Sequence, residues 1–195
     1  MSKKLIAITG GIGSGKSLVL NTLEKAGYPT LSSDKIVKDL YKKPSVKRII
    51  KNLFPNAVKG EKRLAVDYKT LSQLAFKNKE NNQKLTNAIT PLVLEQILKK
   101  ANRIKTSVFV EVPLLFECGF ENRFDSAIVV LRDKNARIES VKIRSNLNKE
   151  QIEDRMNFQV DYDKKDFTNY MVINNDKEIE QIEKQVLELA KELTK

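Results

Sequence analysis

The sequence has no histidine and no tryptophan, and its single cysteine is Cys118. Without histidine, neither a Ser-His nor a Cys-His catalytic pair can form, and zinc sites built from histidine and cysteine are excluded too. One cysteine cannot form a disulfide within the chain, which favours a reducing compartment. No apolar run approaches the roughly 18 residues that span a bilayer, and residues 1–9 lack the layout of an export signal. We therefore expect a cytoplasmic protein that does not associate with membranes.

The length and composition are those of a globular protein with one core. A chain of 195 residues with 41% hydrophobic and 31% charged residues does not require two independent domains. The net charge is +11, and basic residues are most in excess between Asp34 and Arg63. A solvated basic face explains this excess most simply, followed by attraction of a polyanionic small molecule and then by nucleic-acid binding. Aromatic residues are few and scattered, so no nucleic-acid partner is expected.

Glycine is scarce, yet four of the 7 glycines lie between Gly10 and Gly15. Together with Lys16 and Ser17 they match the phosphate-binding pattern G-x-x-x-x-G-K-[ST], which predicts a nucleoside triphosphate ligand. Backbone N–H groups of such a loop can surround phosphate, and the following helix adds its positive end. We expect Lys16 to reach the β and γ phosphates and Ser17 to hold Mg²⁺. The predicted nucleotide-binding residues are Gly11, Ile12, Gly13, Ser14, Gly15, Lys16, Ser17 and Leu18.

The surroundings of this loop favour the same interpretation over a glycine-rich turn that carries Lys-Ser by chance. Residues 4–9 form a short apolar run that is typical of a buried parallel strand. After the loop, Val19, Leu23 and Ala26 recur at helical spacing, and Gly27 follows where a helix commonly ends. The order strand, loop, helix is the one that the motif requires.

Further apolar runs alternate with helical patterns, which predicts an α/β fold with a five-stranded parallel sheet and helices on both faces. The four later strands are expected at 29–32, 107–112, 126–131 and 171–174, and a closing helix at 179–193.

A long stretch without a strand pattern separates the second and third predicted strands. It exceeds an ordinary crossover, so we expect an inserted helical subdomain at 35–104 within a single domain that spans 1–195. Asp67 is expected to cap one of its helices, and Thr90-Pro91 to open another. Pro55 and Gly60 indicate only a local turn.

Acidic residues near strand ends are candidates for catalysis, because ligands of open α/β sheets bind at the carboxyl ends of strands. Asp34 follows the second strand, and Glu111 and Glu117 lie around the third. Asp34 is equally compatible with orienting an acceptor hydroxyl and with capping a helix, where Ser32 and Ser33 compete for the role. For Glu111, contact with Mg²⁺ through water and an exposed strand end remain equal alternatives.

Basic residues follow the fourth predicted strand in a polar segment. We expect 134–168 to form a mobile lid that excludes water from phosphoryl transfer. Each arginine by itself is expected to be a solvated charge, but at least one is expected to contact phosphate. The arginines of this region are Arg132, Arg137, Arg144 and Arg155.

Several of these motifs together resemble the dephospho-CoA kinase family, over essentially the whole chain. They are Thr9–Ser17, Ser33-Asp34, Val112-Pro113-Leu114-Leu115-Phe116-Glu117, Arg155-Met156-x-x-Gln159 and Ile173-Asn174-Asn175. The resemblance implies a P-loop kinase fold that transfers the γ-phosphate of ATP to the ribose 3′-hydroxyl of dephospho-CoA, the last step of coenzyme A synthesis. It implies that Asp34 is the base for the acceptor hydroxyl. It also implies acceptor contacts from Pro113, Leu114, Glu117 and Gln159.

The chain departs from the family pattern in three places. Ser32-Ser33-Asp34 replaces an Asp-x-Asp pair, Thr90-Pro91 replaces His-Pro, and Ser140 stands where a lid arginine is expected. The last change leaves open whether Arg137 or Arg144 contacts phosphate.

Other functions fit the sequence less well. Another nucleoside or nucleotide kinase is the nearest alternative, and a nucleic-acid-associated ATPase is a more distant one. A GTP-dependent switch is disfavoured, because the chain has neither Asn-Lys-x-Asp nor an Asp-x-x-Gly after the loop. The resemblance implies ATP and dephospho-CoA as small-molecule partners, whereas the chemistry of the residues alone does not identify the acceptor. The sequence leaves the oligomeric state open.

Overall fold

The computed structural model describes residues 3–61, 63–145 and 147–195. The chain forms two compact units, of which the first comprises Met1–Ser32 and Lys100–Lys195 and the second Ser33–Lys99. The second unit occupies most of the stretch predicted as an inserted subdomain, although its ends differ from the predicted 35 and 104.

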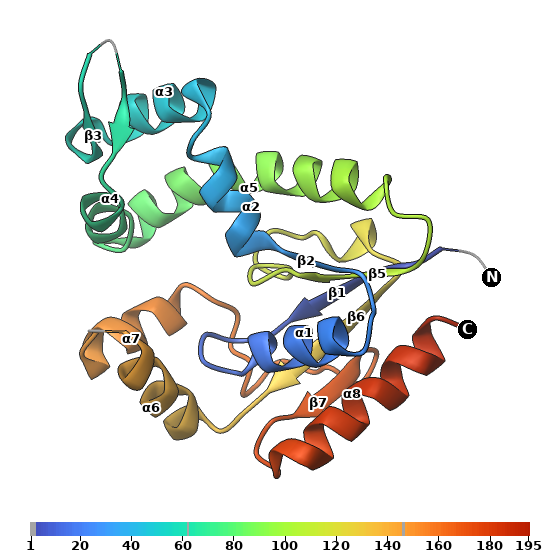
Figure 1. The fold of residues 1–195 in the computed structure, drawn as a ribbon. Helices are drawn as coiled ribbons and strands as arrows, with labels where there is room; N and C mark the ends of the chain where they lie inside the picture. Colours follow the sequence, from blue (N-terminus) through green and yellow to red (C-terminus); the bar gives the residue numbers. More distant parts are fainter. Residues whose placement is uncertain (1–2, 62, 146) are drawn as a thin grey trace. The chain divides into compact units, whose positions relative to one another are not determined.

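The first unit is built on a five-stranded sheet in the order β2-β5-β1-β6-β7 (Figure 1). All its strand pairs are parallel, which confirms the predicted sheet. The strands are β1 (Leu5–Thr9), β2 (Thr30–Ser32), β5 (Val108–Glu111), β6 (Ser126–Leu131) and β7 (Met171–Asn174). Because the strands are parallel, the segments that follow them emerge at the same edge of the sheet.

The central strand β1 explains why these apolar runs become strands. Ile6, Ala7 and Ile8 are fully buried, as expected for a parallel sheet covered on both faces. In the register of the sheet, Ile8 lies beside Glu111 of β5 and Thr9 beside Val129 of β6. The end of β5 therefore lies next to the start of the glycine-rich loop.

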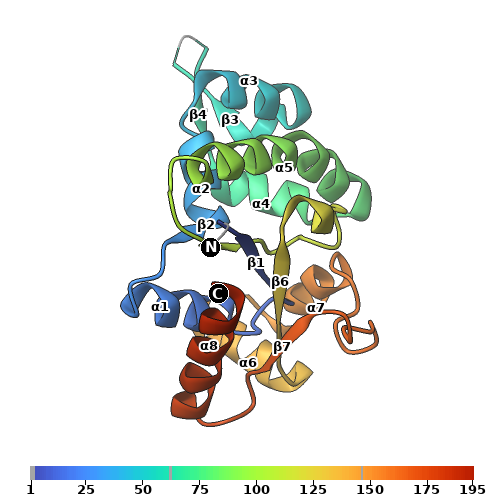
Figure 2. The same cartoon turned by 90° about the vertical axis from the view of Figure 1, so that its right-hand side faces the viewer.

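Helices α1 and α8 lie side by side in both ribbon views and share one core cluster with the sheet (Figures 1 and 2). Gly27, with φ of 85°, ends α1 as predicted. Its N–H donates to Glu24 and that of Tyr28 to Leu23, both at 3.0 Å, which is a Schellman motif. The helices of this unit are α1 (Lys16–Lys25), η2 (Glu121–Arg123), α6 (Lys134–Arg144), α7 (Lys149–Asn157) and α8 (Ile179–Leu193).

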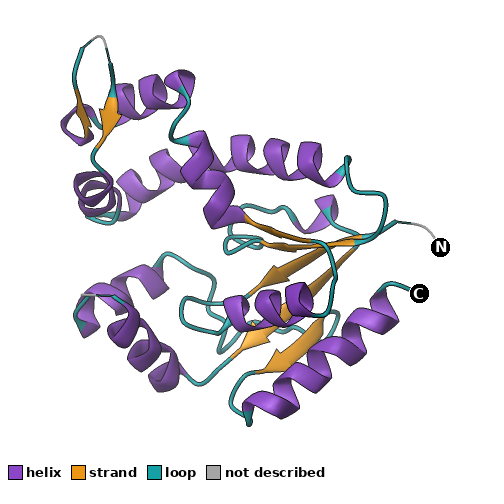
Figure 3. Ribbon diagram, viewed as in Figure 1, coloured by secondary structure: helices purple, strands orange, loops and turns teal. Residues whose placement is uncertain are grey.

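The second unit is mostly helical (Figure 3). Asp67 caps α4 as predicted, because its Oδ1 accepts from the N–H of Thr70 at 3.1 Å. Its elements are α2 (Ser33–Leu40), α3 (Pro44–Leu53), η1 (Pro55–Ala57), β3 (Val58–Lys59), β4 (Ala65–Val66), α4 (Tyr68–Ala75) and most of α5 (Lys79–Ala101). None of the described helices of the chain is long and apolar enough to cross a membrane.

Two predictions for this region are wrong. Thr90-Pro91 does not open a helix, because Pro91 lies inside the continuous helix α5. Buried Ile89, Val93 and Ile97 hold both sides of the proline in one helix, and this packing outweighs the N–H that proline lacks. The stretch also contains strands, since β3 and β4 pair as a short antiparallel hairpin. Two residues per strand are too few to produce an alternating pattern.

Candidate nucleotide-binding site

The glycine-rich loop connects β1 to α1 and is closely packed on its protein side. At Gly10, with φ of 150°, a Cβ atom would overlap the Val130 carbonyl and lie 2.7 Å from Oγ of Ser14. At Gly15, with φ of 97°, it would overlap the Asn175 amide. The N–H groups that open a helix generally lack an acceptor within that helix. They form the kind of N-terminus at which phosphate binds.

Lys16 is the first residue of α1 and is only 9% exposed. Its Nζ donates to the carbonyl oxygens of Gly10 at 2.8 Å and Gly11 at 3.0 Å. The ammonium group therefore lies against the loop from which it is expected to reach phosphate. Ser17, the next residue, is exposed.

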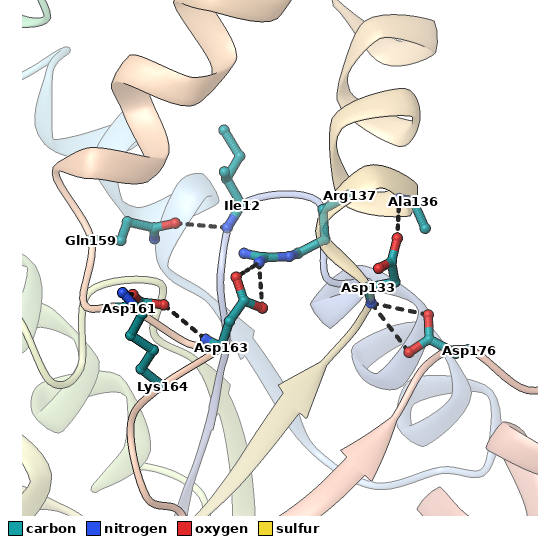
Figure 4. A network of polar contacts seen from close by, with 9 residues as sticks. All are labelled: Ile12, Asp133, Ala136, Arg137, Gln159, Asp161, Asp163, Lys164 and Asp176. Carbon is teal, nitrogen blue, oxygen red and sulfur yellow. Dashed lines mark hydrogen bonds and ion pairs between the residues drawn. The ribbon is translucent and has the colours of Figure 1, made fainter.

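Two amide side chains from distant parts of the sequence hold the loop. Oε1 of Gln159 accepts from the N–H of Ile12 at 2.7 Å (Figure 4), and Nε2 donates to the carbonyl of Pro113 at 3.4 Å. Nδ2 of Asn175 donates to the carbonyl of Ser14 at 2.7 Å. Both ends of the Gln159 amide are thus bonded to the protein.

Glu117 follows β5 and joins it to the segment after α7. Its Oε1 accepts from the N–H of Val160 at 2.9 Å. Its Oε2 is buried without a hydrogen-bond partner among the residues that the structure describes. Burial raises the pKa of this carboxyl, while the nearby charge of Lys16 opposes that rise.

Glu111 is the last residue of β5 and is buried, so the exposed-strand-end alternative is wrong. Its Oε2 accepts from the hydroxyl of Ser32 at 3.0 Å. This hydrogen bond offsets part of the cost of burying a carboxylate. It also gives Ser32, which departs from the family pattern, a role at the end of β2.

Asp34 belongs to the second unit, where it is exposed. Helix α2 begins at Ser33, so Asp34 lies inside the first turn instead of preceding the helix as its cap. The helix-cap alternative is therefore wrong. A carboxylate in a first turn is stabilised by the positive end of the helix.

The arginines after β6 have different surroundings. Arg137, on α6, is 5% exposed and forms an ion pair with Asp163 at 2.7 Å (Figure 4). Arg144 is exposed at the end of the same helix. Nη1 of Arg132 donates to Oγ of Ser140 at 2.6 Å. Ser140, which stands where an arginine is expected, therefore accepts a hydrogen bond from a different arginine. Asp163 was not predicted from the sequence, since a single acidic residue in a polar segment does not indicate a partner or a function.

Helices α6 and α7 form a small apolar cluster that includes part of the loop. Ile138, Val141 and Ile152 are buried in it, and Ile12 packs against them. Tyr162 contributes nearby, since its hydroxyl lies 3.3 Å from Oγ1 of Thr9 at the end of β1. The phosphate-binding loop is thus supported by side chains that follow β6 and β7 along the chain.

The parallel sheet and a lysine-bearing glycine-rich loop between β1 and α1 define a P-loop nucleotide-binding protein. A crystal structure of TT1252 from Thermus thermophilus is similar, with a TM-score of 0.82, 31% identity and all of both chains covered. The dephospho-CoA kinase from Campylobacter jejuni has a TM-score of 0.67 and 26% identity, and 99% of this chain and 98% of that one are covered. The dephospho-CoA kinase of Fusobacterium nucleatum is 34% identical, over 95% of this chain and 96% of its own.

The family model for dephospho-CoA kinase matches residues 4–181. The chain belongs to the dephospho-CoA kinase family, as its motifs indicated. It is therefore an ATP-dependent phosphotransferase of coenzyme A biosynthesis.

Proposed function

We propose that this chain phosphorylates the ribose 3′-hydroxyl of dephospho-CoA directly from ATP, without a covalent enzyme intermediate. The observation that carries the proposal is the Lys16 ammonium group held against a phosphate-binding loop, in a chain of this family. A phosphoryl group in transfer needs mainly positioning and charge stabilisation, and a preformed loop supplies both.

In this proposal the loop and the start of α1 bind the phosphates of ATP. Lys16 exchanges its bonds to Gly10 and Gly11 for bonds to the β and γ phosphates, which lie at the same loop. The nucleotide contacts are those of residues 11–18. Gln159 and Asn175 support this role, because they fix the N–H of Ile12 and the carbonyl of Ser14 in the loop.

The residues at the loop also fit a magnesium ion. Mg²⁺ keeps several of its waters and needs few protein ligands, so an exposed hydroxyl and one nearby carboxylate are enough. Ser17 supplies the hydroxyl, and Glu111, at the end of the strand beside β1, supplies a carboxylate that would act through water. When bound, the ion neutralises charge on the phosphates. Among the described residues, no group of three or more acidic, cysteine or histidine side chains forms an alternative metal site.

Asp34 is proposed to accept the proton of the 3′-hydroxyl as its oxygen attacks the γ-phosphorus. The bond to the β-phosphate oxygen breaks, and the leaving ADP carries that electron pair. An arginine offsets the charge on the transferring group. Of the two candidates Arg137 and Arg144, the burial of Arg137 beside the loop supports Arg137.

The acceptor is proposed to contact Pro113, Leu114, Glu117 and Gln159 after β5 and α7. Gln159 already bonds to Ile12 through Oε1 and to Pro113 through Nε2, so a contact with the acceptor has to use the second lone pair of Oε1 or the second N–H of Nε2. Basic residues around Lys38 and Arg48 would attract the pyrophosphate of dephospho-CoA. We propose residues 134–168 as a lid, the cytoplasm as the location, and no nucleic-acid partner.

The test is incubation of the purified protein with Mg-ATP and a panel of acceptors, read by mass spectrometry. The panel contains dephospho-CoA, AMP, CMP, dTMP, deoxynucleosides and RNA. We expect dephospho-CoA alone to gain one phosphoryl group, and we expect that group on the ribose. Phosphorylation of another nucleotide in its place would overturn the proposal, and omission of magnesium tests the metal requirement.

A further inference from the structure

The short segment from Gln159 to Asp163 runs past the phosphate-binding loop and is tied to it repeatedly. Gln159 accepts from the N–H of Ile12, and Asp163 forms an ion pair with Arg137 (Figure 4). Between them, the N–H of Val160 donates to Glu117. The proposed chemistry uses only part of this arrangement. It assigns no role to Asp163.

The contact between Asp163 and Arg137 is unusual in its geometry. Nη2 of Arg137 donates to both carboxylate oxygens of Asp163, at 2.8 and 2.7 Å. A guanidinium group commonly pairs with a carboxylate through two of its nitrogens. Here one nitrogen takes both oxygens, so the remaining donors face elsewhere.

One of those remaining donors, Nη1, lies at the loop. A Cβ atom on Gly11 would be 2.6 Å from Nη1 of Arg137, and one on Gly13 would be 2.5 Å from the Arg137 carbonyl. Nε of Arg137 is buried and has no hydrogen-bond partner within the described part of the chain. A buried donor without a partner is costly. A donor next to a phosphate-binding loop gains most from an anionic ligand there.

Asp163 is itself held in place by the segment that carries it. Oδ1 of Asp161 accepts from the N–H of Asp163 at 3.1 Å, and Lys164 lies 3.4 Å from Oδ2 of Asp161 (Figure 4). This N–H bond is the main cause of a lowered pKa at Asp161. The side chain of Asp163 is 49% exposed, whereas that of Arg137 is 6% exposed. The carboxylate thus reaches inward from the surface to a buried cation.

We infer that Asp163 is a positioning residue for phosphoryl transfer, which holds the Arg137 guanidinium so that its other donors face the phosphates of the nucleotide. An arginine side chain has many rotamers, and fixing it before the ligand binds removes that entropy from the binding step. The inference rests on the proposed role of Arg137 in this kinase. It predicts that a substitution at Asp163 weakens binding of nucleotides that carry a γ-phosphate more than binding of ADP.

The first test measures nucleotide binding by calorimetry, without any acceptor. The probes are ADP and the non-hydrolysable β,γ-imido analogue of ATP. We expect Asp163→Asn to weaken binding of the analogue about tenfold more than binding of ADP, since a charge-assisted contact to the third phosphate is lost. Asp163→Glu retains the charge and should restore part of the preference. Asp166→Asn is the matched control, because Asp166 lies three residues after Asp163 but bonds to Thr168.

The second test asks whether Asp163 acts through Arg137. In a double-mutant cycle on kcat with dephospho-CoA, Asp163→Asn should cause little further loss once Arg137 is replaced by lysine. Additive losses would overturn the inference, and so would an unchanged ratio of the two nucleotide affinities with only a lower unfolding temperature. Tighter analogue binding by Asp163→Asn would also overturn it, because Asp163 would then compete with phosphate.

Two further outcomes can also be interpreted, namely a variant that does not fold and a native protein that does not phosphorylate dephospho-CoA. If Asp163→Asn does not fold, Arg137→Lys in the otherwise native chain should show the same selective loss for the analogue, and its absence counts against the inference. If the native protein binds both nucleotides but leaves dephospho-CoA unchanged, the proposed function fails. The nucleotide ratio still decides the role of Asp163 in that case.

Discussion

The phosphate-binding loop and the first turn of α2 are built in contrasting ways. The loop is packed against residues from distant parts of the chain, with Gly10 against Val130 and Ile12 bonded to Gln159. Asp34, in the other unit, is exposed in the first turn of an eight-residue helix. A change in the loop therefore disturbs the fold together with nucleotide binding. A change at Asp34 should disturb mainly the chemistry, so substitutions in the two regions should separate loss of stability from loss of turnover.

The largest effect is expected for Asp34→Asn. Loss of general-base assistance should lower kcat by about 10² to 10⁴, which corresponds to roughly 3 to 5 kcal/mol of barrier. The free energy of unfolding should fall by no more than about 1 kcal/mol, which is the usual contribution of a charge in the first turn of a helix. Steady-state kinetics and urea unfolding of the same preparation measure both. Asp39→Asn on the same helix is the control, and an Asp34 variant with native turnover would remove this residue from the mechanism.

Gly10→Ala should give the opposite pattern. Its methyl group would overlap the carbonyl of Val130 in a backbone conformation that disfavours side chains. We expect a loss of about 3 kcal/mol in the free energy of unfolding, together with weaker ATP binding. Gly119→Ala is the matched control, because its φ of 63° is also positive but nothing lies within 4 Å of the added Cβ. It should cost about 1 kcal/mol, and equal losses at both positions would contradict the packing argument.

A smaller loss is expected when the cap of α4 is removed. Asp67→Ala should lower the free energy of unfolding by about 1 kcal/mol, because the N–H of Thr70 loses its acceptor. Asp67→Asn keeps an acceptor in the same place and should retain most of the stability. Thermal or urea unfolding checks both variants, and an alanine variant as stable as the asparagine one would show that the cap contributes nothing.

The last effect is a change in the shape of a pH profile. Burial raises the pKa of Glu117 above its ordinary 4.5, so the folded state holds this proton more tightly than the unfolded state does. The group stabilises the fold below pH 4.5, and this contribution is lost as the pH rises through the folded pKa. Glu117→Gln should flatten that decline in urea unfolding measured at several pH values. A variant that keeps the native slope would place the titration on another group.

The sheet could be predicted because most of its strands are mainly apolar, as in β1, β5 and β6. Residues 126–131 and 171–174 have the bounds expected for β6 and β7. The helix around Pro91 could not, since packing of buried neighbours overrides the local preference of proline. Local sequence patterns predict local structure, and such predictions fail where tertiary contacts determine the secondary structure.

The same distinction applies to the site. The loop motif is contiguous, so its residues could be named from the sequence. The partners that hold it are far away in the chain, with Gln159 bonded to Ile12 and Asp163 paired with Arg137. A charge or an amide in a polar segment carries no sign of its partner. Burial of Glu111 likewise depends on Ser32 of a neighbouring strand.

The side chain of Ile12 has a mechanical consequence. It belongs to the phosphate-binding loop and also packs into the apolar cluster of α6 and α7. If these two helices swing outward to release product, they must withdraw from Ile12 and expose apolar surface to water. Opening and loosening of the grip on the nucleotide would then be a single event.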